Sequence, residues 1–227
     1  MYHPDDSEFQ ALASKGDLVP VYFEMDVGSN SPVTVYQKVV SDTSRGFLLE
    51  SVQGQERLAR YSFIGTDPYK IIKTELSDVV AQKPTLAPLE TQLGRLRVVQ
   101  NENLPRYTGG ADGYLGYECN GYFETSVPQA NPIGANEIPQ AMFMLVDTMV
   151  VFDHIQGKIQ IISHARIHED GKDAYKKAVD RIENLRNKIS RPLANPLPDL
   201  PSMDGMSPSP DGFEANINQS EYYDMVN

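Results

Sequence analysis

The sequence of 227 residues has one cysteine, few basic residues and no long apolar run. Cys119 cannot form an internal disulfide, which indicates a reducing compartment such as the cytoplasm. The 20 Lys and Arg are outnumbered by 31 Asp and Glu, and the net charge of −11 argues against nucleic acid or anionic membranes as partners. We find no secretion signal and no apolar segment near the ~18 residues that a membrane span needs.

What remains is typical of a globular protein with a sizeable core, because 40% of the residues are hydrophobic and 22% are charged. Predicted helices occur in blocks between antiparallel strands, which indicates an α+β fold with antiparallel sheets and flanking helices. The predicted helices are residues 5–15, Val33–Val40, Leu86–Val99, Asp173–Ile189 and Glu221–Asn227. The predicted strands are Val19–Asp26, Phe47–Val52, Arg60–Gly65, Pro68–Thr74, Ala141–Phe152, Lys158–Ile167 and Phe213–Ile217.

The composition changes near residue 191, where a stretch rich in proline and serine replaces the patterned sequence. We therefore divide the chain into residues 1–190, a linker over 191–212 and a last segment, 213–227. The helix predicted at the end of that segment has barely two turns and needs tertiary packing to be stable. We expect the chain to be a fragment whose next domain is missing; the alternative is a frayed C-terminal tail.

Several residue types that often carry chemistry have a simpler interpretation here. His164 and His168 are four residues apart, a spacing that suits a metal site only on a helix. Here His164 lies on a predicted strand and His168 lies beyond its end, so we expect exposed histidines at a strand end instead of a metal site. Cys119 lacks a CxxC partner and is predicted to be a small buried thiol. The glycines of "GGADGYLGYECNGYFE", residues 109–124, match no phosphate-binding loop and are predicted to allow a close backbone approach, a bulge or a bend.

The stretch from Gly46 to Gly65 places charged groups beside two apolar strands. In one interpretation Glu50 pairs with Arg57 or Arg60 and ties the strands together, because a buried charge is costly unless it is paired. In the other interpretation, these groups bind a zwitterion. The carboxylate binds its ammonium group, an arginine binds its carboxylate, and leucines line a pocket for its side chain. Spacing alone leaves both open.

Three motifs in this chain resemble anthranilate synthase component I. They are "LLES" followed by "ERLARYSFIG", then "GGADGYLGYECNGYFE", and finally "FEANINQSEYYDMV". The motifs keep the order found in that family and cover landmarks from Phe47 to the end. One departure is Glu118, where the family commonly has aspartate, so the role of that carboxylate stays open.

The resemblance implies a role in tryptophan biosynthesis. The intact enzyme makes anthranilate and pyruvate from chorismate, with Mg²⁺ and with ammonia that a glutamine amidotransferase subunit supplies, and L-tryptophan inhibits it by feedback. Residues 1–190 would be the N-terminal regulatory region and residues 213–227 the start of the chorismate-binding catalytic domain. The fold would then be an incomplete part of that family's fold, and we expect this chain alone to be inactive.

The same resemblance assigns residues to the inhibitor. Ser51, Glu50 and Leu49 of the "LLES" motif would contact tryptophan, and Arg60, Tyr61 and Ser62 belong to the facing motif. Because an ideal strand directs Glu50 and Ser51 to opposite faces, both reach one ligand only if the strand ends or bulges there, or if one acts through its backbone. No catalytic residue and no metal ligand is assigned in this chain.

Three other functions stay open at this point. The runner-up enzyme is aminodeoxychorismate synthase component I of the folate pathway, which differs in making a 4-amino instead of a 2-amino product. The chain could also be a complete, stand-alone module that binds an amino acid. Finally, it could be a structural half-domain whose charged groups only join strands.

Overall fold

The computed structural model describes residues 1–40, 45–50, 60–75, 78, 86–94, 96–124, 126, 138–193 and 217–226. The chain divides into two compact units, residues 1–193 and 194–227. Most of the predicted linker and all of the strand predicted at 213–217 except Ile217 lie outside the described residues. The division into regulatory and catalytic parts stays a prediction.

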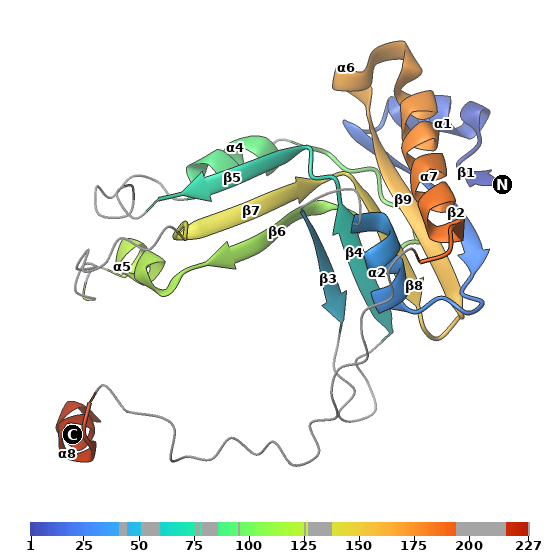
Figure 1. Ribbon diagram of the computed structural model, residues 1–227. Coiled ribbons are helices and arrows are strands. Elements are labelled where there is room, and N and C mark those ends of the chain that lie inside the picture. Colours follow the sequence, from blue (N-terminus) through green and yellow to red (C-terminus); the bar gives the residue numbers. More distant parts are fainter. Residues whose placement is uncertain are drawn as a thin grey trace. The chain divides into compact units, whose positions relative to one another are not determined.

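The first unit contains a six-stranded antiparallel sheet whose strands are ordered β1-β2-β9-β8-β4-β3 (Figure 1). The longest pairing joins β2 to β9 over nine residue pairs, from Leu18 opposite Arg166 to Asp26 opposite Lys158. β3 pairs only with β4 among the described strands and therefore forms one edge of the sheet. The six strands are β1 (Tyr2–His3), β2 (Leu18–Asp26), β3 (Gly46–Glu50), β4 (Tyr61–Thr66), β8 (Thr148–Asp153) and β9 (Lys158–Arg166).

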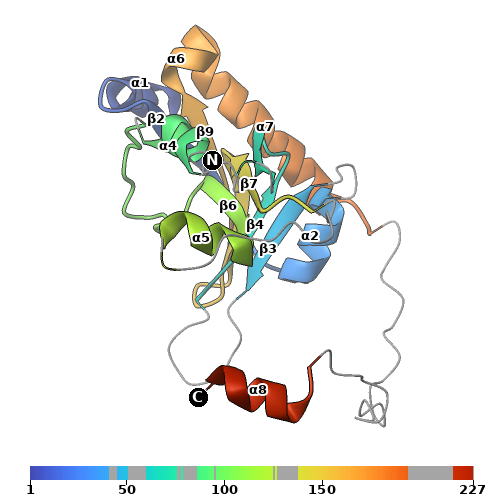
Figure 2. The same cartoon turned by 90° about the vertical axis from the view of Figure 1, so that its left-hand side faces the viewer.

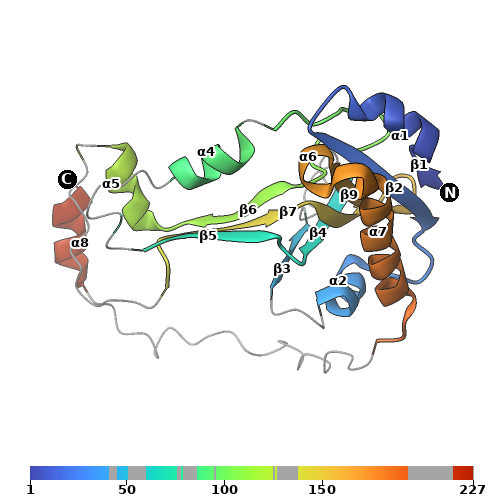
Figure 3. The same ribbon diagram turned by 90° about the horizontal axis from the view of Figure 1, so that it is seen from above.

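A second antiparallel sheet has three strands in the order β5-β7-β6, which run side by side in Figure 3. They are β5 (Lys70–Thr74), β6 (Gly110–Leu115) and β7 (Ala141–Val146). β6 and β7 approach so closely at Gly113 that an added Cβ would lie 1.9 Å from the carbonyl oxygen of Met142. The expectation that glycines of this stretch permit a close backbone approach is confirmed at this position.

The remaining elements of the first unit are helices. Figure 2 shows α2 beside β3 and β4, and in Figure 1 α7 lies along β9. The α-helices are α1 (Asp6–Ala13), α2 (Pro32–Val40), α4 (Ala87–Leu93), α5 (Asn120–Phe123), α6 (Ile167–Asp170) and α7 (Ala174–Ser190). Two 3-10 turns, η1 (Tyr117–Cys119) and η2 (Gly171–Asp173), precede α5 and α7.

Local sequence explains where the first helices begin. The Asp5 side chain accepts the backbone N–H of Glu8, and the Glu8 carboxylate accepts the N–H of Asp5, which is the capping box that the spacing predicts. Ser31 caps α2 in the same way, because its hydroxyl accepts the N–H of Thr34 at 3.2 Å. Each cap satisfies backbone donors that a helix start leaves unpaired.

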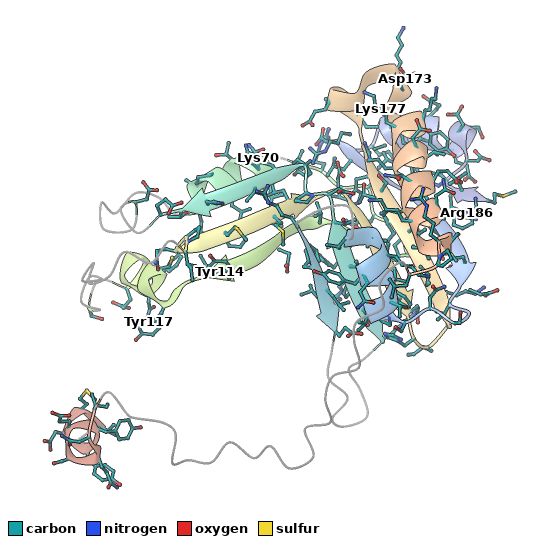
Figure 4. All side chains as sticks on the ribbon, viewed as in Figure 1. Lys70, Tyr114, Tyr117, Asp173, Lys177 and Arg186 are labelled. Atoms are coloured by element: carbon teal, nitrogen blue, oxygen red, sulfur yellow. The ribbon has the colours of Figure 1, made fainter. Side chains whose placement is uncertain are left out.

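The larger core lies between the six-stranded sheet and the helices α2 and α7. The periodic apolar residues of α7 fill it, as the helical spacing predicts. Polar residues such as Lys177 remain at the surface of the helix (Figure 4). A smaller core covers the opposite face of the sheet and includes Phe47, Met149 and Ile162, with Phe63 and Tyr107 packed against it.

The run from Ala141 to Phe152 is not one strand, as the sequence predicts, but two. Asp147 separates β7 from β8, and the two strands belong to different sheets. The predicted hairpin at Gln156-Gly157 is confirmed, since β8 and β9 pair across that turn. The helix predicted over Leu86–Val99 is shorter and ends at Leu93, just before Gly94.

The second unit has one described element, α8 (Gln219–Val226). Asn218 caps it: its side chain accepts the N–H of Glu221 at 2.9 Å, and the Glu221 carboxylate accepts the N–H of Asn218 at 3.0 Å. The helix begins at Gln219, two residues before the predicted start at Glu221. Tyr222 and Tyr223 on it are each 53% exposed.

Candidate functional site

The residues that the motifs assign to an inhibitor lie at the ends of two paired strands, β3 and β4. Glu50 is opposite Ser62, and Leu49 is opposite Phe63. Ser51 lies outside the described residues. The described part of the site therefore consists of the ends of β3 and β4.

Register and packing show that the assigned residues divide between the two faces of the sheet. Leu48 and Ile64 pack in the larger core, so Glu50 and Ser62, two residues away, lie on that face. Tyr61 packs on the smaller core of the opposite face. Leu49 lies on this second face too and is 40% exposed.

Glu50, Ser62 and His154 form a hydrogen-bonded chain on the first face. The Ser62 hydroxyl is 3.3 Å from Glu50 Oε1 and 2.7 Å from Nε2 of His154, and Ser62 is only 2% exposed. A hydroxyl has one proton to donate, so when Ser62 donates to Glu50, its oxygen accepts from a protonated Nε2. The buried serine thus fixes a carboxylate and an imidazole relative to each other.

His154 is a residue that sequence reasoning missed. It follows β8 directly, its N–H donates to the carbonyl of Arg60 at 2.8 Å, and its ring stacks on Phe152. Its place after "VVFD" at the end of a predicted strand is a weak signal. Only the pairing of β4 with β8, which is remote in sequence, brings it to Ser62.

Arg60 is paired with Asp153, not with Glu50. Its Nε and Nη2 donate to Asp153 Oδ2 at 3.1 and 2.8 Å, and its guanidinium lies 4.7 Å from the centre of the Tyr61 ring. The predicted Glu50–Arg60 pair is wrong because the antiparallel register of β4 and β8 puts a buried carboxylate beside Arg60. Arg57 lies outside the described residues.

The environment of Asp153 keeps it ionised. Burial raises its pKa, but hydrogen bonds from Arg60 and from the backbone of Gln156 and Ile155 outweigh that effect and hold the pKa below its usual value. The same hydrogen bond raises the pKa of Arg60. The ion pair with Asp153 holds the Arg60 guanidinium in one orientation just before β4 begins.

His164 is buried, and the expectation of an exposed histidine at this position is wrong. It is 3% exposed, and its Nε2 lies 3.2 Å from the hydroxyl of Thr108. Burial lowers the pKa of His164 to about 4, so the ring is neutral at pH 7. Pairing of β9 between β2 and β8 encloses this residue, which no local pattern reveals. Cys119 is 1% exposed, and the prediction of a buried thiol is confirmed.

No group of three or more His, Cys, Asp or Glu side chains within the described ranges is placed to hold a metal ion. Among the helices of those ranges, none combines the length and the apolar character needed to cross a bilayer.

Comparison with known proteins gives consistent relatives. The chain is 34% identical over 225 residues to the probable anthranilate synthase component 1 of Schizosaccharomyces pombe, covering 96% of this chain and 43% of that protein. It is 31% identical over 235 residues to anthranilate synthase component 1 of Pseudomonas aeruginosa, covering 96% of this chain and 46% of that protein. The chain therefore spans less than half the length of these curated relatives.

Among solved structures, anthranilate synthase component I from Streptococcus pneumoniae TIGR4 matches 74% of this chain and 38% of its own, with 23% identity and a TM-score of 0.43. The relatives confirm the resemblance that the three motifs indicate. A family model described as chorismate binding enzyme matches residues 45–227. That match covers most of the chain, and the chain belongs to the family of chorismate-binding enzymes.

Proposed function

We propose that this chain is the N-terminal, tryptophan-sensing part of an anthranilate synthase component I. The observation that carries the proposal is the identity of 34% over 96% of this chain to a probable anthranilate synthase component 1. We propose that the whole protein converts chorismate and ammonia to anthranilate and pyruvate, with a glutamine amidotransferase, component II, as its partner. This chain alone is proposed to be inactive.

The strand ends offer chemistry suited to an amino-acid inhibitor. In the proposal Glu50 accepts the tryptophan ammonium, and the buried Ser62 holds that carboxylate in place. Glu50 is the last described residue of the edge strand β3, and in the proposal the ligand lies beside it and contacts groups from both faces of the sheet. In the proposal, Leu49 and Tyr61 contact the ligand from the second face.

Arg60 has a different place in this proposal from Glu50. Asp153 occupies one edge of its guanidinium, so a ligand carboxylate would meet the remaining edge. Ser51 is retained as an inhibitor contact from the motif alone. We propose that tryptophan favours a conformation unable to close on chorismate, which is a shift between two populations.

Mg²⁺ belongs to the proposed activity of the whole protein. No group of acidic or histidine side chains suited to it is present in the part of the chain that the structure describes. We therefore assign no magnesium ligand among these residues.

The experiment that tests the proposal starts from the source transcript, read past the codon for Asn227. The complete reading frame is expressed with an amidotransferase subunit, and the product formed from chorismate and glutamine is identified by mass and fluorescence. The proposal expects anthranilate. A 4-amino product would assign the chain to aminodeoxychorismate synthase, and a stop codon at that point together with tryptophan binding by this chain alone would assign a stand-alone binding module.

A further inference from the structure

A cavity of about 240 Å³ in the first unit is lined by the start of β2, the end of β9 and the segment that leads from α4 to β6. More than half of the residues that line it are apolar, and the rest include a few buried polar groups, which is the usual composition of a small-molecule site. None of the residues assigned above to the inhibitor lines it. The apolar lining includes Leu18, Pro20, Leu93, Leu96, Val98 and Leu104.

The wall that the segment after α4 contributes is held in place by hydrogen bonds to the start of β2. The N–H groups of Asp17 and Leu18 donate to the carbonyl of Arg97 at 2.8 and 3.1 Å, and the N–H of Val99 donates to the carbonyl of Leu18 at 2.9 Å. The Asp17 carboxylate also accepts the backbone N–H and the guanidinium Nε–H of Arg97. The cavity is therefore already formed in the folded chain.

A histidine and a threonine provide the enclosed polar surface of the cavity. His164 is 3% exposed, and its Nε2 lies 3.2 Å from the hydroxyl of Thr108. Nδ1 of this ring makes no hydrogen bond with a described residue. In the described part of the chain, the unpaired side-chain atoms without accessible surface lie on Tyr107 and Gln160, so Nδ1 keeps accessible surface. Gly109 has no side chain to cover this edge of the ring, since an added Cβ would lie 2.9 Å from Nδ1.

The pair of His164 and Thr108 leaves one donor and one acceptor for a ligand. Because burial lowers the pKa of His164 to about 4, the ring carries a single proton at pH 7. When this proton is on Nδ1, Nδ1 donates, and the Thr108 hydroxyl gives its own proton to Nε2 and keeps a lone pair. When the proton is on Nε2 and is donated to Thr108, the hydroxyl proton is free and Nδ1 accepts. A ligand hydroxyl both donates and accepts, so it matches either arrangement.

The charges around the cavity favour a neutral ligand. Arg166 is 8% exposed and is paired with Asp147, whose Oδ2 lies 3.2 Å from its Nε, and with Glu169. Arg106 also lines the cavity, but it is exposed and solvent screens its charge. An ionised group on the ligand would lose its hydration without gaining an unpaired counter-charge among the enclosed described residues.

The volume of the cavity suits a ring of about six carbons. A cavity of about 150 Å³ with apolar walls can hold benzene, so this larger cavity has room for a hydroxyl group as well. We propose that the cavity binds a small neutral molecule with an apolar ring and one hydroxyl group, and that this hydroxyl bonds to His164 Nδ1 and to Thr108. The inference does not rest on the proposed tryptophan-sensing function, because the inhibitor residues lie outside this cavity.

The test is a titration of the 227-residue chain with phenol at pH 7, followed by amide NMR shifts, and a second titration with toluene. Toluene has about the same size but no hydroxyl, so transfer from water alone would make it the tighter ligand. The proposal expects the opposite order, with saturable phenol shifts at Gly109 and Gly110. Phenol should bind at least about threefold more tightly than toluene, which is less than one ordinary hydrogen bond supplies.

Two variants test the polar pair directly. Thr108→Val nearly keeps the shape of the side chain but removes its hydroxyl, so toluene should become the tighter ligand. His164→Phe should have the same effect, and Thr108→Val remains informative if the His164 variant fails to fold.

Two controls separate this cavity from other parts of the chain. Thr91→Val makes the same chemical change on α4, outside the cavity, and should keep the preference for phenol. Ser51→Phe alters the proposed inhibitor site and should keep it too. Tighter binding of toluene to the wild type, the absence of saturable phenol shifts at Gly109 and Gly110, or a preference for phenol that survives in Thr108→Val would overturn the inference.

Discussion

Asp153 is the last residue of β8, and its carboxylate accepts several hydrogen bonds there. Removing this carboxylate should lower the free energy of unfolding of the first unit. Its Oδ2 accepts two donors of Arg60, and its Oδ1 accepts the N–H groups of Ile155 and Gln156, both at 3.0 Å. Each backbone hydrogen bond is worth about 1 kcal/mol. The Arg60 pair adds about 1 kcal/mol, because the Arg60 side chain is 46% exposed and solvent screens it.

Asp153→Ala is therefore expected to lower the free energy of unfolding by about 3 kcal/mol. Urea denaturation at pH 7, followed by circular dichroism, measures this difference. Asp26→Ala is the matched control, because Asp26 also forms a short ion pair, 2.7 Å from Lys158, but its side chain is 83% exposed. It should cost less than about 1 kcal/mol. Equal losses in the two variants would refute the reasoning from burial.

The contribution of Asp153 should also depend on pH in a defined direction. Its folded-state pKa is lowered, so the unfolded state binds its proton at a higher pH than the folded state does. The stabilisation is present above the unfolded pKa of about 3.9 and is lost as the pH falls through the folded value. The difference between wild type and Asp153→Ala should shrink in acid; a constant difference down to pH 2 would contradict this assignment.

Two further predictions concern buried features. The pKa of His164 is lowered to about 4, so stability should fall by about 2 to 3 kcal/mol as the pH drops from about 6.5 towards 4. Urea unfolding at several pH values should show a flatter profile for His164→Asn than for the wild type. Gly113→Ala should cost more than about 2 kcal/mol, because its Cβ would meet backbone of β7. Gly157→Ala, at a φ of 64° with nothing within 4 Å of the added Cβ, should cost only about 1 kcal/mol, and a larger loss there than at Gly113 would contradict the account.

Local patterns in the sequence predict the elements of this fold well. The capping box at Asp5 and Glu8, the proline after Ser31 and the apolar repeat of α7 each depend on residues within a few positions. Such signals act through backbone hydrogen bonds and one helix face, so they do not need the rest of the chain. The α+β class and its antiparallel sheets follow from the order of these elements and are confirmed.

The sequence predicts the partners across the sheet poorly. Asp147 is the single charged residue in the apolar run that contains β7 and β8, and only the separate pairing of the two strands shows that it divides two sheets. Burial of His164 and pairing of Arg60 with Asp153 depend likewise on strands remote in sequence. The two-residue period of side chains along a strand determines which residues share a face of the sheet. It does not determine which strand lies next to it or which residues cover that face.

The central proposal is that this chain senses tryptophan for an anthranilate synthase. The most direct measurement is the tryptophan concentration that halves anthranilate formation by the complete protein, compared between wild type, Ser51→Phe and a control, Ser14→Phe, at an exposed helix end. The account predicts at least a tenfold rise for Ser51→Phe, with uninhibited turnover largely retained, and no change for Ser14→Phe. Equal sensitivity of Ser51→Phe and wild type would contradict it.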